Sequence, residues 1–248
     1  MTSRMLTTCA LLCALYFPIN AFAIVINEIR IDQPGADTDE YFELAGLPGT
    51  PLDGLSYIVI GDGTGGSGVI EAVIDLSGLV IPTDGFFLAA ESTFSLAGNV
   101  DLTTSLNFEN SDNVTHMLVN GLSAAYGSDL DSNDDGILDS TPWTGIFDAV
   151  ALLNSSSSGD QTYSSNLVGP VDGSVPLHIY RSPDITGTWQ IGLADPVNGN
   201  DSAGGKNHSV SVPEPGTLLL LTLGFLILRL CRFINPADDF IQKGSVFT

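Results

Sequence analysis

The chain has 248 residues and a formal net charge of −22, with 29 acidic residues against seven lysines and arginines. So negative a surface repels phosphate backbones, which argues against a nucleic-acid-binding function. The three cysteines, Cys9, Cys13 and Cys231, lie in the two apolar terminal segments, so no disulfide is expected within the part of the chain that lies between these segments.

The N-terminal segment has the features of a secretory signal peptide. Arg4 supplies a positive charge, an apolar run spans residues 6–17, and Ala21-Phe22-Ala23 places small residues at the two positions that a signal peptidase recognises. The alternative is a first membrane span, but the run is shorter than the roughly 20 apolar residues that a spanning helix needs. We therefore expect residues 1–23 to be a signal peptide, with Ala21 and Ala23 marking the cleavage site.

Residues 24–212 form the expected mature part. They contain 26 acids and three bases (Arg30, Arg181 and Lys206), a net charge of −23. Their length suits one domain with a sizeable core. With no cysteine present, stability must come from burial, to which a bound metal would add.

Short stretches rich in β-branched and aromatic residues, separated by Gly, Pro, Asp and Asn, predict strands rather than helices over residues 24–195. Strands are expected at residues 24–31, 41–44, 55–60, 69–76, 86–90, 114–119, 146–153, 177–181 and 188–193. Many short strands at fairly even spacing are typical of a β-sandwich. The stretches 61–68 and 155–159 are expected to be flexible loops.

Several of these strands carry motifs in a characteristic order. They are Asn27-Glu28-Ile29, Glu40-Tyr41-Phe42-Glu43-Leu44, Leu52-Asp53-Gly54-Leu55-Ser56-Tyr57 and Phe86-Phe87-Leu88-Ala89. In this order they resemble the bacterial lamin-tail domain, and the resemblance covers most of residues 24–200. It implies an all-β, immunoglobulin-like sandwich that serves as a binding or positioning module. Such modules are sometimes attached to secreted hydrolases.

Residues 131–139 have the spacing of a calcium-binding loop. Oxygen-bearing side chains occupy its positions 1, 3, 5 and 9, Gly136 permits the sharp turn, and the carbonyl of position 7 adds a ligand. The expected ligands are Asp131, Asn133, Asp135, Ile137 and Asp139. Pro142 stands where an EF-hand has its bidentate Glu, so one ligand is missing. An acidic surface turn is the alternative interpretation.

No catalytic set is predicted. His116, His178 and His208 lie far apart in the sequence, without the spacing of a metal-binding or nucleophilic motif. Glu28, Glu40 and Glu43 offer carboxylates of the kind that a glycosidase uses. The favoured interpretation is that they are strand residues bonded to neighbouring backbone amides.

The C-terminal part predicts a linker followed by a sorting signal. Residues 196–212 are expected to hold the domain away from a membrane. Pro213-Glu214-Pro215 then precedes an apolar run over residues 218–228, and Arg229 and Arg232 follow as a basic stop. This order resembles the PEP-CTERM sorting domain over residues 213–232. The resemblance implies a transmembrane helix and processing by a membrane-embedded exosortase. Residues 233–248 form an unexplained tail.

Two functional hypotheses follow. The first is an exported, non-catalytic protein of the cell envelope or extracellular matrix. It would be anchored only transiently in the membrane, and its sandwich domain would bind an extracellular polysaccharide or a surface protein. The second is a secreted calcium-dependent hydrolase acting on a polysaccharide or a phosphoester.

Overall fold

A computed structural model describes residues 24–63, 65–155, 161–197 and 199–208 of the chain. The expected signal peptide with Ala21 and Ala23, the sorting segment 213–232 with its expected helix, and the tail 233–248 lie outside these residues. Within the described residues, no helix is long and apolar enough to cross a membrane.

The described residues form eleven strands and no helix, which confirms the all-β prediction. The strands are β1 (Val25–Arg30), β2 (Tyr41–Ala45), β3 (Leu55–Gly61), β4 (Val69–Asp75), β5 (Phe86–Ala90), β6 (Leu102–Thr103), β7 (Val114–Asn120), β8 (Gly145–Leu152), β9 (Leu167–Val168), β10 (His178–Ser182) and β11 (Thr188–Ile191). The nine expected strands are all present, each within two residues of its expected ends. The sequence missed β6 and β9, which have two residues each and so carry no alternation to detect.

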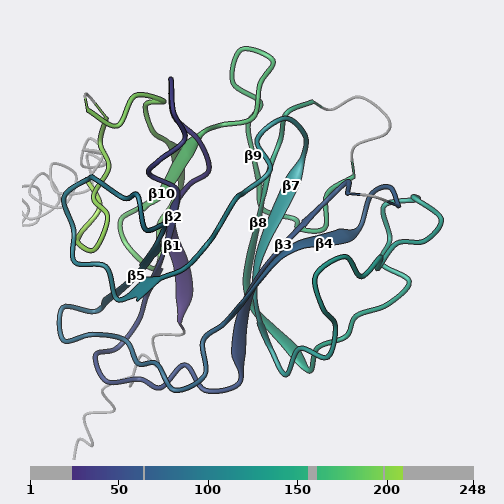
Figure 1. Ribbon diagram of the computed structural model, residues 1–248, viewed down its shortest axis with the longest axis horizontal. Helices are drawn as coiled ribbons and strands as arrows, with labels where there is room; N and C mark the ends of the chain where they lie inside the picture. The colour runs from purple at the N-terminus through teal and green to yellow at the C-terminus, as the bar shows by residue number, and fades with distance from the viewer. Residues whose placement is uncertain (1–23, 64, 156–160, 198, 209–248) are drawn as a thin grey trace, which may run out of the picture. The chain divides into compact units, whose positions relative to one another are not determined.

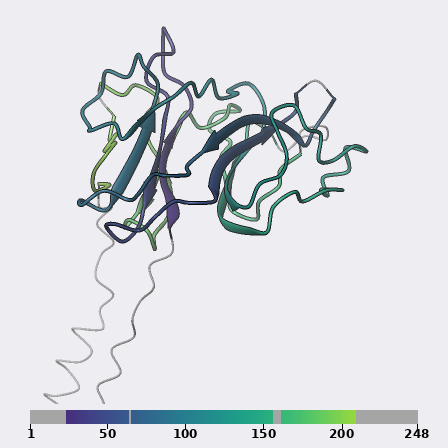
Figure 2. The ribbon, with the colours of Figure 1, turned by 60° about the horizontal axis from the view of Figure 1, so that its bottom comes forward.

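The strands form two sheets, which lie as separate layers in both views (Figures 1 and 2). The first sheet has the order β11-β10-β1-β2-β5-β6 and the second the order β4-β3-β7-β8-β9. Neighbours are antiparallel, except that β6 pairs in parallel with β5, and β9 with β8. Because β1 pairs with β10, the two ends of the domain meet in the middle of the first sheet.

The two sheets share one apolar core. Ile26 and Ile29 of β1 pack in the same cluster as Leu118 of β7 and Val150 of β8. Across the sheets, the rings of Phe42 and Tyr57 stack with their centroids 3.7 Å apart and their planes 5° apart. Each such side chain contributes about 1.5–3 kcal/mol by leaving water. This common burial joins the sheets into one domain.

The outer faces of both sheets are also covered. On the second sheet, Ile58, Ile60 and Met117 pack beneath the segment that connects β7 to β8, including Leu130 and Trp143. On the first sheet, a smaller cluster contains Tyr41, Leu88, Ala90 and Ala203, with Phe94, Leu96 and Val100 against it. Burial on two sides explains why β2, β3 and β5 are buried along their whole length.

Residues 199–208, named the strap below, depart from the expectation of a free linker. Ala203 in the strap is 5% exposed and packs on the outer face of the first sheet. Polar strap residues bond to the buried Arg30 of β1 and Glu43 of β2, and Asp201 of the strap lies 3.8 Å from His178 of β10. The strap therefore belongs to the domain rather than to a spacer between the domain and the sorting segment.

Candidate functional site

The predicted calcium loop is centred on a buried carboxylate. Asp131 is fully buried, and its Oδ2 accepts hydrogen bonds from the Gly136 N–H at 2.9 Å and the Tyr163 hydroxyl at 2.8 Å. Its Oδ1 accepts from the Asp135 N–H at 3.2 Å. Gly136 has a φ of 83°, the left-handed conformation that glycine adopts at little cost. Burial is the main cause that raises the pKa of the Tyr163 hydroxyl, and the hydrogen bond to Asp131 raises this pKa further.

The other expected ligands do not converge on Asp131. Asp139 accepts from the N–H and hydroxyl of Ser132 at 3.1 and 2.7 Å, while Asn133 donates to Asp135 at 3.1 Å. The side chain of Ile137, whose carbonyl is the expected ligand, is 71% exposed. These hydrogen bonds connect residues of the loop to one another, and the loop consists of successive turns. Calcium binding by the loop stays a prediction.

The glycine-rich stretch 61–68, expected to be a flexible loop, approaches the calcium loop closely. A Cβ on Gly66 would lie 2.3 Å from Asp134 Oδ1, and a Cβ on Gly68 would lie 2.5 Å from Asp131 Cβ. Either contact is too short for any other residue without movement. The glycines therefore allow two backbone segments to pack together, a role that composition alone did not reveal.

A second polar group lies on the outer face of the first sheet, beneath the strap. Glu28 of β1 accepts hydrogen bonds from the Tyr41 hydroxyl at 2.6 Å and from the Ser202 N–H at 3.0 Å, and it contacts His178 Nε2 at 2.7 Å. Asp201 of the strap accepts from the same Tyr41 hydroxyl at 2.9 Å. Within the described residues, Glu28, His178 and Asp201 form the one group of potential metal ligands whose ligand atoms lie within 4.8 Å of one another.

Arg30 ties the strap to the sheet. Its Nε and Nη2 donate to the two oxygens of Asp201, each at 2.6 Å, and neither side chain is more than 6% exposed. Its Nη1 also donates to the carbonyls of Asp32 and Ala194. A planar, two-point contact of this kind is among the stronger hydrogen-bonded ion pairs in proteins. Removing one partner would strand a buried charge.

Glu43 of β2 is a third anchor for the strap. It pairs directly with Glu28 in the β1–β2 register, an arrangement that two ionised carboxylates would oppose. Glu43 accepts from Asn27 at 2.8 Å and from the N–H groups of Gly204 and Gly205 at 2.8 and 3.1 Å. Burial, with the added repulsion of Glu28, raises the pKa of Glu43 well above its usual value.

These contacts give the acids of the strand motifs structural roles. Glu28 and Glu43 accept strap amides, and Glu40 accepts the Phe108 N–H at 2.8 Å. The sequence had assigned them backbone amides as partners, and the structure agrees. What the sequence missed was the partner segment, because nothing in a stretch rich in Gly, Asn, Asp and Ser distinguishes a docked strap from a free linker.

The histidines are likewise accounted for individually. His116 is fully buried, its Nδ1 lies 2.8 Å from the Tyr57 hydroxyl, and burial lowers its pKa to about 3. His178 belongs to the group under the strap, and His208 is exposed at the end of the strap. Within the described residues, the three histidines therefore do not form a metal-binding group with one another.

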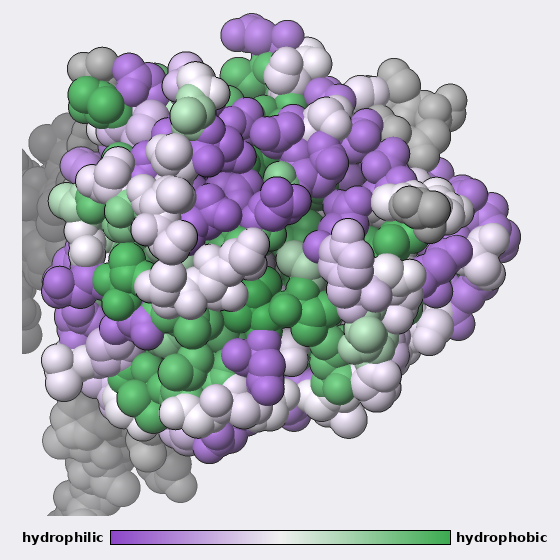
Figure 3. Space-filling view, in the orientation of Figure 1, coloured by the Kyte–Doolittle hydropathy of each residue, from purple (hydrophilic) through white to green (hydrophobic). Residues whose placement is uncertain are grey.

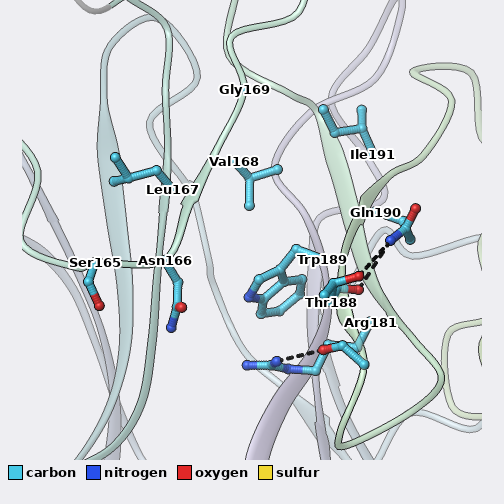
Figure 4. Close-up of a pocket in the computed structure, with 11 residues that line it drawn as sticks. Ser165, Asn166, Leu167, Val168, Gly169, Arg181, Thr188, Trp189, Gln190 and Ile191 are labelled. Atoms are coloured by element: carbon cyan, nitrogen blue, oxygen red, sulfur yellow. Dashed lines mark hydrogen bonds between the residues drawn. The ribbon is translucent and has the colours of Figure 1, made fainter.

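A groove lies where the edge strands of the two sheets approach each other (Figure 4). It has a volume of about 680 Å³ and is lined by Ser165, Asn166, Leu167, Val168, Gly169, Arg181, Gly187, Thr188, Trp189, Gln190 and Ile191. None of these residues is acidic, although the chain as a whole is strongly acidic. This groove was not predicted from the sequence, because its two walls come from strands of different sheets.

The Trp189 ring is held at the centre of the groove. The Arg181 guanidinium lies 4.4 Å from the ring centroid and donates to both oxygens of Asp148, at 3.1 and 2.9 Å. Figure 4 shows Asn166 and Leu167 across the groove from Trp189, while Gln190 turns away and bonds to Thr188. The groove therefore offers apolar surface, amide and hydroxyl groups, and a single cation whose charge is already paired.

The surface combines polar and apolar areas. Figure 3 shows apolar residues gathered in the lower half of the face in view, beneath a broad hydrophilic area. Contiguous apolar surface of this kind is often a contact surface for another molecule.

The comparison with known families identifies the C-terminal segment. Residues 211–232 match the PEP-CTERM protein-sorting motif. This match covers the predicted sorting residues Pro213, Glu214 and Pro215, and it supports export, transient membrane anchoring and processing by an exosortase. No curated protein and no solved structure matches the chain.

Proposed function

We propose that the chain is an exported, non-catalytic protein of the cell envelope or extracellular matrix, and that its two-sheet domain binds an extracellular polysaccharide or a surface protein. The match to the sorting motif carries the proposal. That motif begins three residues after the strap, so the folded domain immediately precedes the processing signal. Such an arrangement fits a domain that is the exported cargo.

The finer fold assignment is an immunoglobulin-like, lamin-tail-like sandwich. Three of the motifs that carry the resemblance lie at β1, β2 and β3, and β1 pairs directly with β2. The fourth lies on β5, the other neighbour of β2. Two mainly antiparallel sheets around one core support this assignment, and a sandwich of this type commonly presents binding surfaces rather than catalytic groups.

The groove between β9 and β11 is the favoured ligand site. It lacks acids in an acidic protein, which favours a neutral or anionic polymer over a cationic one. Its amide and hydroxyl groups suit the hydroxyls of a polysaccharide or the backbone of a peptide. The calcium loop would then stabilise the domain rather than act on the ligand. The acids that a hydrolase would need are instead bonded to backbone amides, which ranks binding above hydrolysis.

The binding proposal is tested with the full chain purified in detergent and isolated cell-surface polysaccharide or surface-protein fractions. Leu167 lines the groove and is 54% exposed, so Leu167→Glu places a charge there without opening the core. Leu47, 45% exposed and outside the groove, provides the matched control Leu47→Glu. We expect retention of the unmodified chain and the control, with at least tenfold weaker retention of Leu167→Glu. Equal binding by both variants would remove the groove from the proposal.

A further inference from the structure

The groove between β9 and β11 is bounded by the edges of two sheets. β11 is the last strand of the first sheet and β9 is the last strand of the second, so each pairs with a neighbour on one side only. An edge strand presents backbone N–H and C=O groups that a further strand can pair. The strand registers show which residues present these groups to the groove.

On β11, the outward backbone groups belong to Trp189 and Ile191. Along an antiparallel strand, residues that bond the partner strand alternate with residues whose N–H and C=O point away from it. The Gly192 N–H donates to the His178 carbonyl at 2.9 Å, and the register with β10 continues without a shift. Gly192 and Gln190 therefore bond β10, whereas Trp189 and Ile191 point their groups away from it. Among the described residues, nothing pairs with these outward groups.

The opposite wall presents the backbone groups of Leu167. The Ala151 N–H donates to the Asn166 carbonyl at 2.9 Å, so that carbonyl faces β8. The Leu153 N–H donates in the same way to the Val168 carbonyl at 2.8 Å. Because successive carbonyls alternate in direction along a strand, Leu167 points its own N–H and C=O away from β8. Figure 4 shows Leu167 on the wall opposite β11, so unpaired backbone groups lie on both walls.

The side chains beside the groove differ between the two faces of β11. Trp189 packs against the shared core, to which Val168 of the opposite wall also belongs. Thr188 and Gln190 lie on the other face of β11, because side chains alternate along a strand. A strand laid along β11 would therefore place every second side chain beside apolar surface and the others beside hydroxyl and amide groups.

Building on the proposed function, we propose that the groove binds an extended peptide segment of a surface protein, which adds as a strand to the free edge of β11. In this mode main-chain hydrogen bonds supply affinity and alternate side chains supply selectivity. A polysaccharide has no donors and acceptors that recur at the spacing of a β-strand, so it matches Trp189 and Ile191 less well. A second copy of the chain also fits less well, since two molecules of formal net charge −22 repel each other.

A proline at position 191 tests the backbone contact. Ile191→Pro removes an N–H that points away from β10, so the bonds to β10 stay, and proline is tolerated at such an edge. The matched control is Val73→Pro on β4, an edge strand of the second sheet. The Leu76 N–H donates to the Leu55 carbonyl at 3.0 Å, so by the same alternation the Val73 N–H points away from β3. The melting temperature of each variant shows whether it folds.

The probe is a neutral peptide of alternating threonine and valine, acetylated and amidated at its ends. Its binding to the full chain in detergent is measured by calorimetry. We expect the unmodified chain and Val73→Pro to bind the probe, and Ile191→Pro to bind it about tenfold more weakly, the effect of losing one hydrogen bond. Two further peptides are N-methylated, one at its valines and the other at its threonines, so that each lacks the donors of one edge. At least one of them should bind the unmodified chain about tenfold more weakly.

Strand addition is overturned if the probe does not bind the unmodified chain, or if Ile191→Pro folds and binds it as tightly as Val73→Pro does. It is also overturned if both methylated peptides bind like the parent peptide, and this comparison decides alone if Ile191→Pro does not fold. Dimers of the unmodified chain that Ile191→Pro dissociates would assign the edge to a second copy and overturn the proposal as well.

The outcomes for the proposed function are separate. If Leu167→Glu loses retention of the surface fractions while the probe does not bind, the groove remains the ligand site and only strand addition fails. If the probe binds but no surface fraction is retained, the proposed function is contradicted while the free edge of β11 still pairs with a peptide.

Discussion

Replacing Asp201 with alanine is expected to release the strap and destabilise the domain. Arg30 would lose both of its contacts at 2.6 Å, and its charge would remain buried. Breaking a buried ion pair by removing one partner costs about 3–5 kcal/mol. Arg30 keeps its bonds to the carbonyls of Asp32, Leu193 and Ala194, so we place the cost near 3 kcal/mol.

The assay is urea and thermal denaturation of the full chain in detergent, each monitored by the fluorescence of Trp143 and Trp189, the two tryptophans of the chain. For a domain of this size, a loss of about 3 kcal/mol lowers the melting temperature by about 6–12 °C. The matched control is Lys206→Ala, an exposed strap position. Exposed substitutions of this kind change stability by about 0.5 kcal/mol or less.

Limited proteolysis gives an independent measure. If the strap is anchored by Arg30, cleavage within residues 199–208 should be slow in the parent chain and much faster in Asp201→Ala. A loss of unfolding free energy below about 1 kcal/mol, together with unchanged proteolysis, would refute the argument. A buried guanidinium that has lost its partner should destabilise the domain by more than that.

Three further predictions concern calcium, pH and processing. Millimolar calcium should raise the melting temperature by a few degrees, since saturation at about ten times Kd contributes about 1.4 kcal/mol; a chain that responds equally to magnesium has only screened charge. Stability should fall as pH rises from 5 to 8, because burial raises the folded-state pKa of Glu40 to about 8 and that of Glu71 to about 7, against the usual 4.5, so the folded form binds more protons than the unfolded form. In calcium-free buffer, Glu40→Gln should remove part of this loss of stability between pH 5 and 8, on the order of 2 kcal/mol once solvent screening is allowed for. If the dependence of stability on pH does not change, the raised pKa of Glu40 is contradicted. Mass spectrometry of the envelope fraction should show chains that begin at Ile24 and lack Thr248, whereas replacing Pro213-Glu214-Pro215 by three alanines should preserve the C-terminus.

The strands were predictable because their signal is local. In β3, for example, β-branched and aromatic residues follow one another over Tyr57-Ile58-Val59-Ile60, and burial on both faces explains why the run is continuous rather than alternating. The spacing of residues 131–139 predicted a calcium-binding loop, which stays a prediction, and it did not predict the contacts of Asp131. Strands β6 and β9 are too short to have a period, and each forms only by pairing with a longer neighbour.

The strap and the groove were not predictable, because both depend on residues far apart in the sequence. Asp201 meets Arg30 across 171 positions, and the groove joins β9 to β11 from different sheets. One signal was available: Glu28 and Arg30 lie among the isoleucines of a strongly apolar strand. Buried charges in such a strand require partners, and the sequence does not say where those partners lie.

The strap also limits where the chain can be processed. Asn207 donates to the carbonyls of Asn27 and Arg181 at 3.2 and 2.9 Å, so the contacts that close the first sheet continue almost to the end of the strap. The sorting motif begins at residue 211. Cleavage before residue 200 would remove Asp201 and deprive Arg30, Glu28 and Glu43 of their partners in the strap. Cleavage after residue 208 would keep every one of these contacts. A stable mature protein therefore requires processing within or beyond the short interval that separates the strap from Pro213, so the fold itself restricts the position of the mature C-terminus.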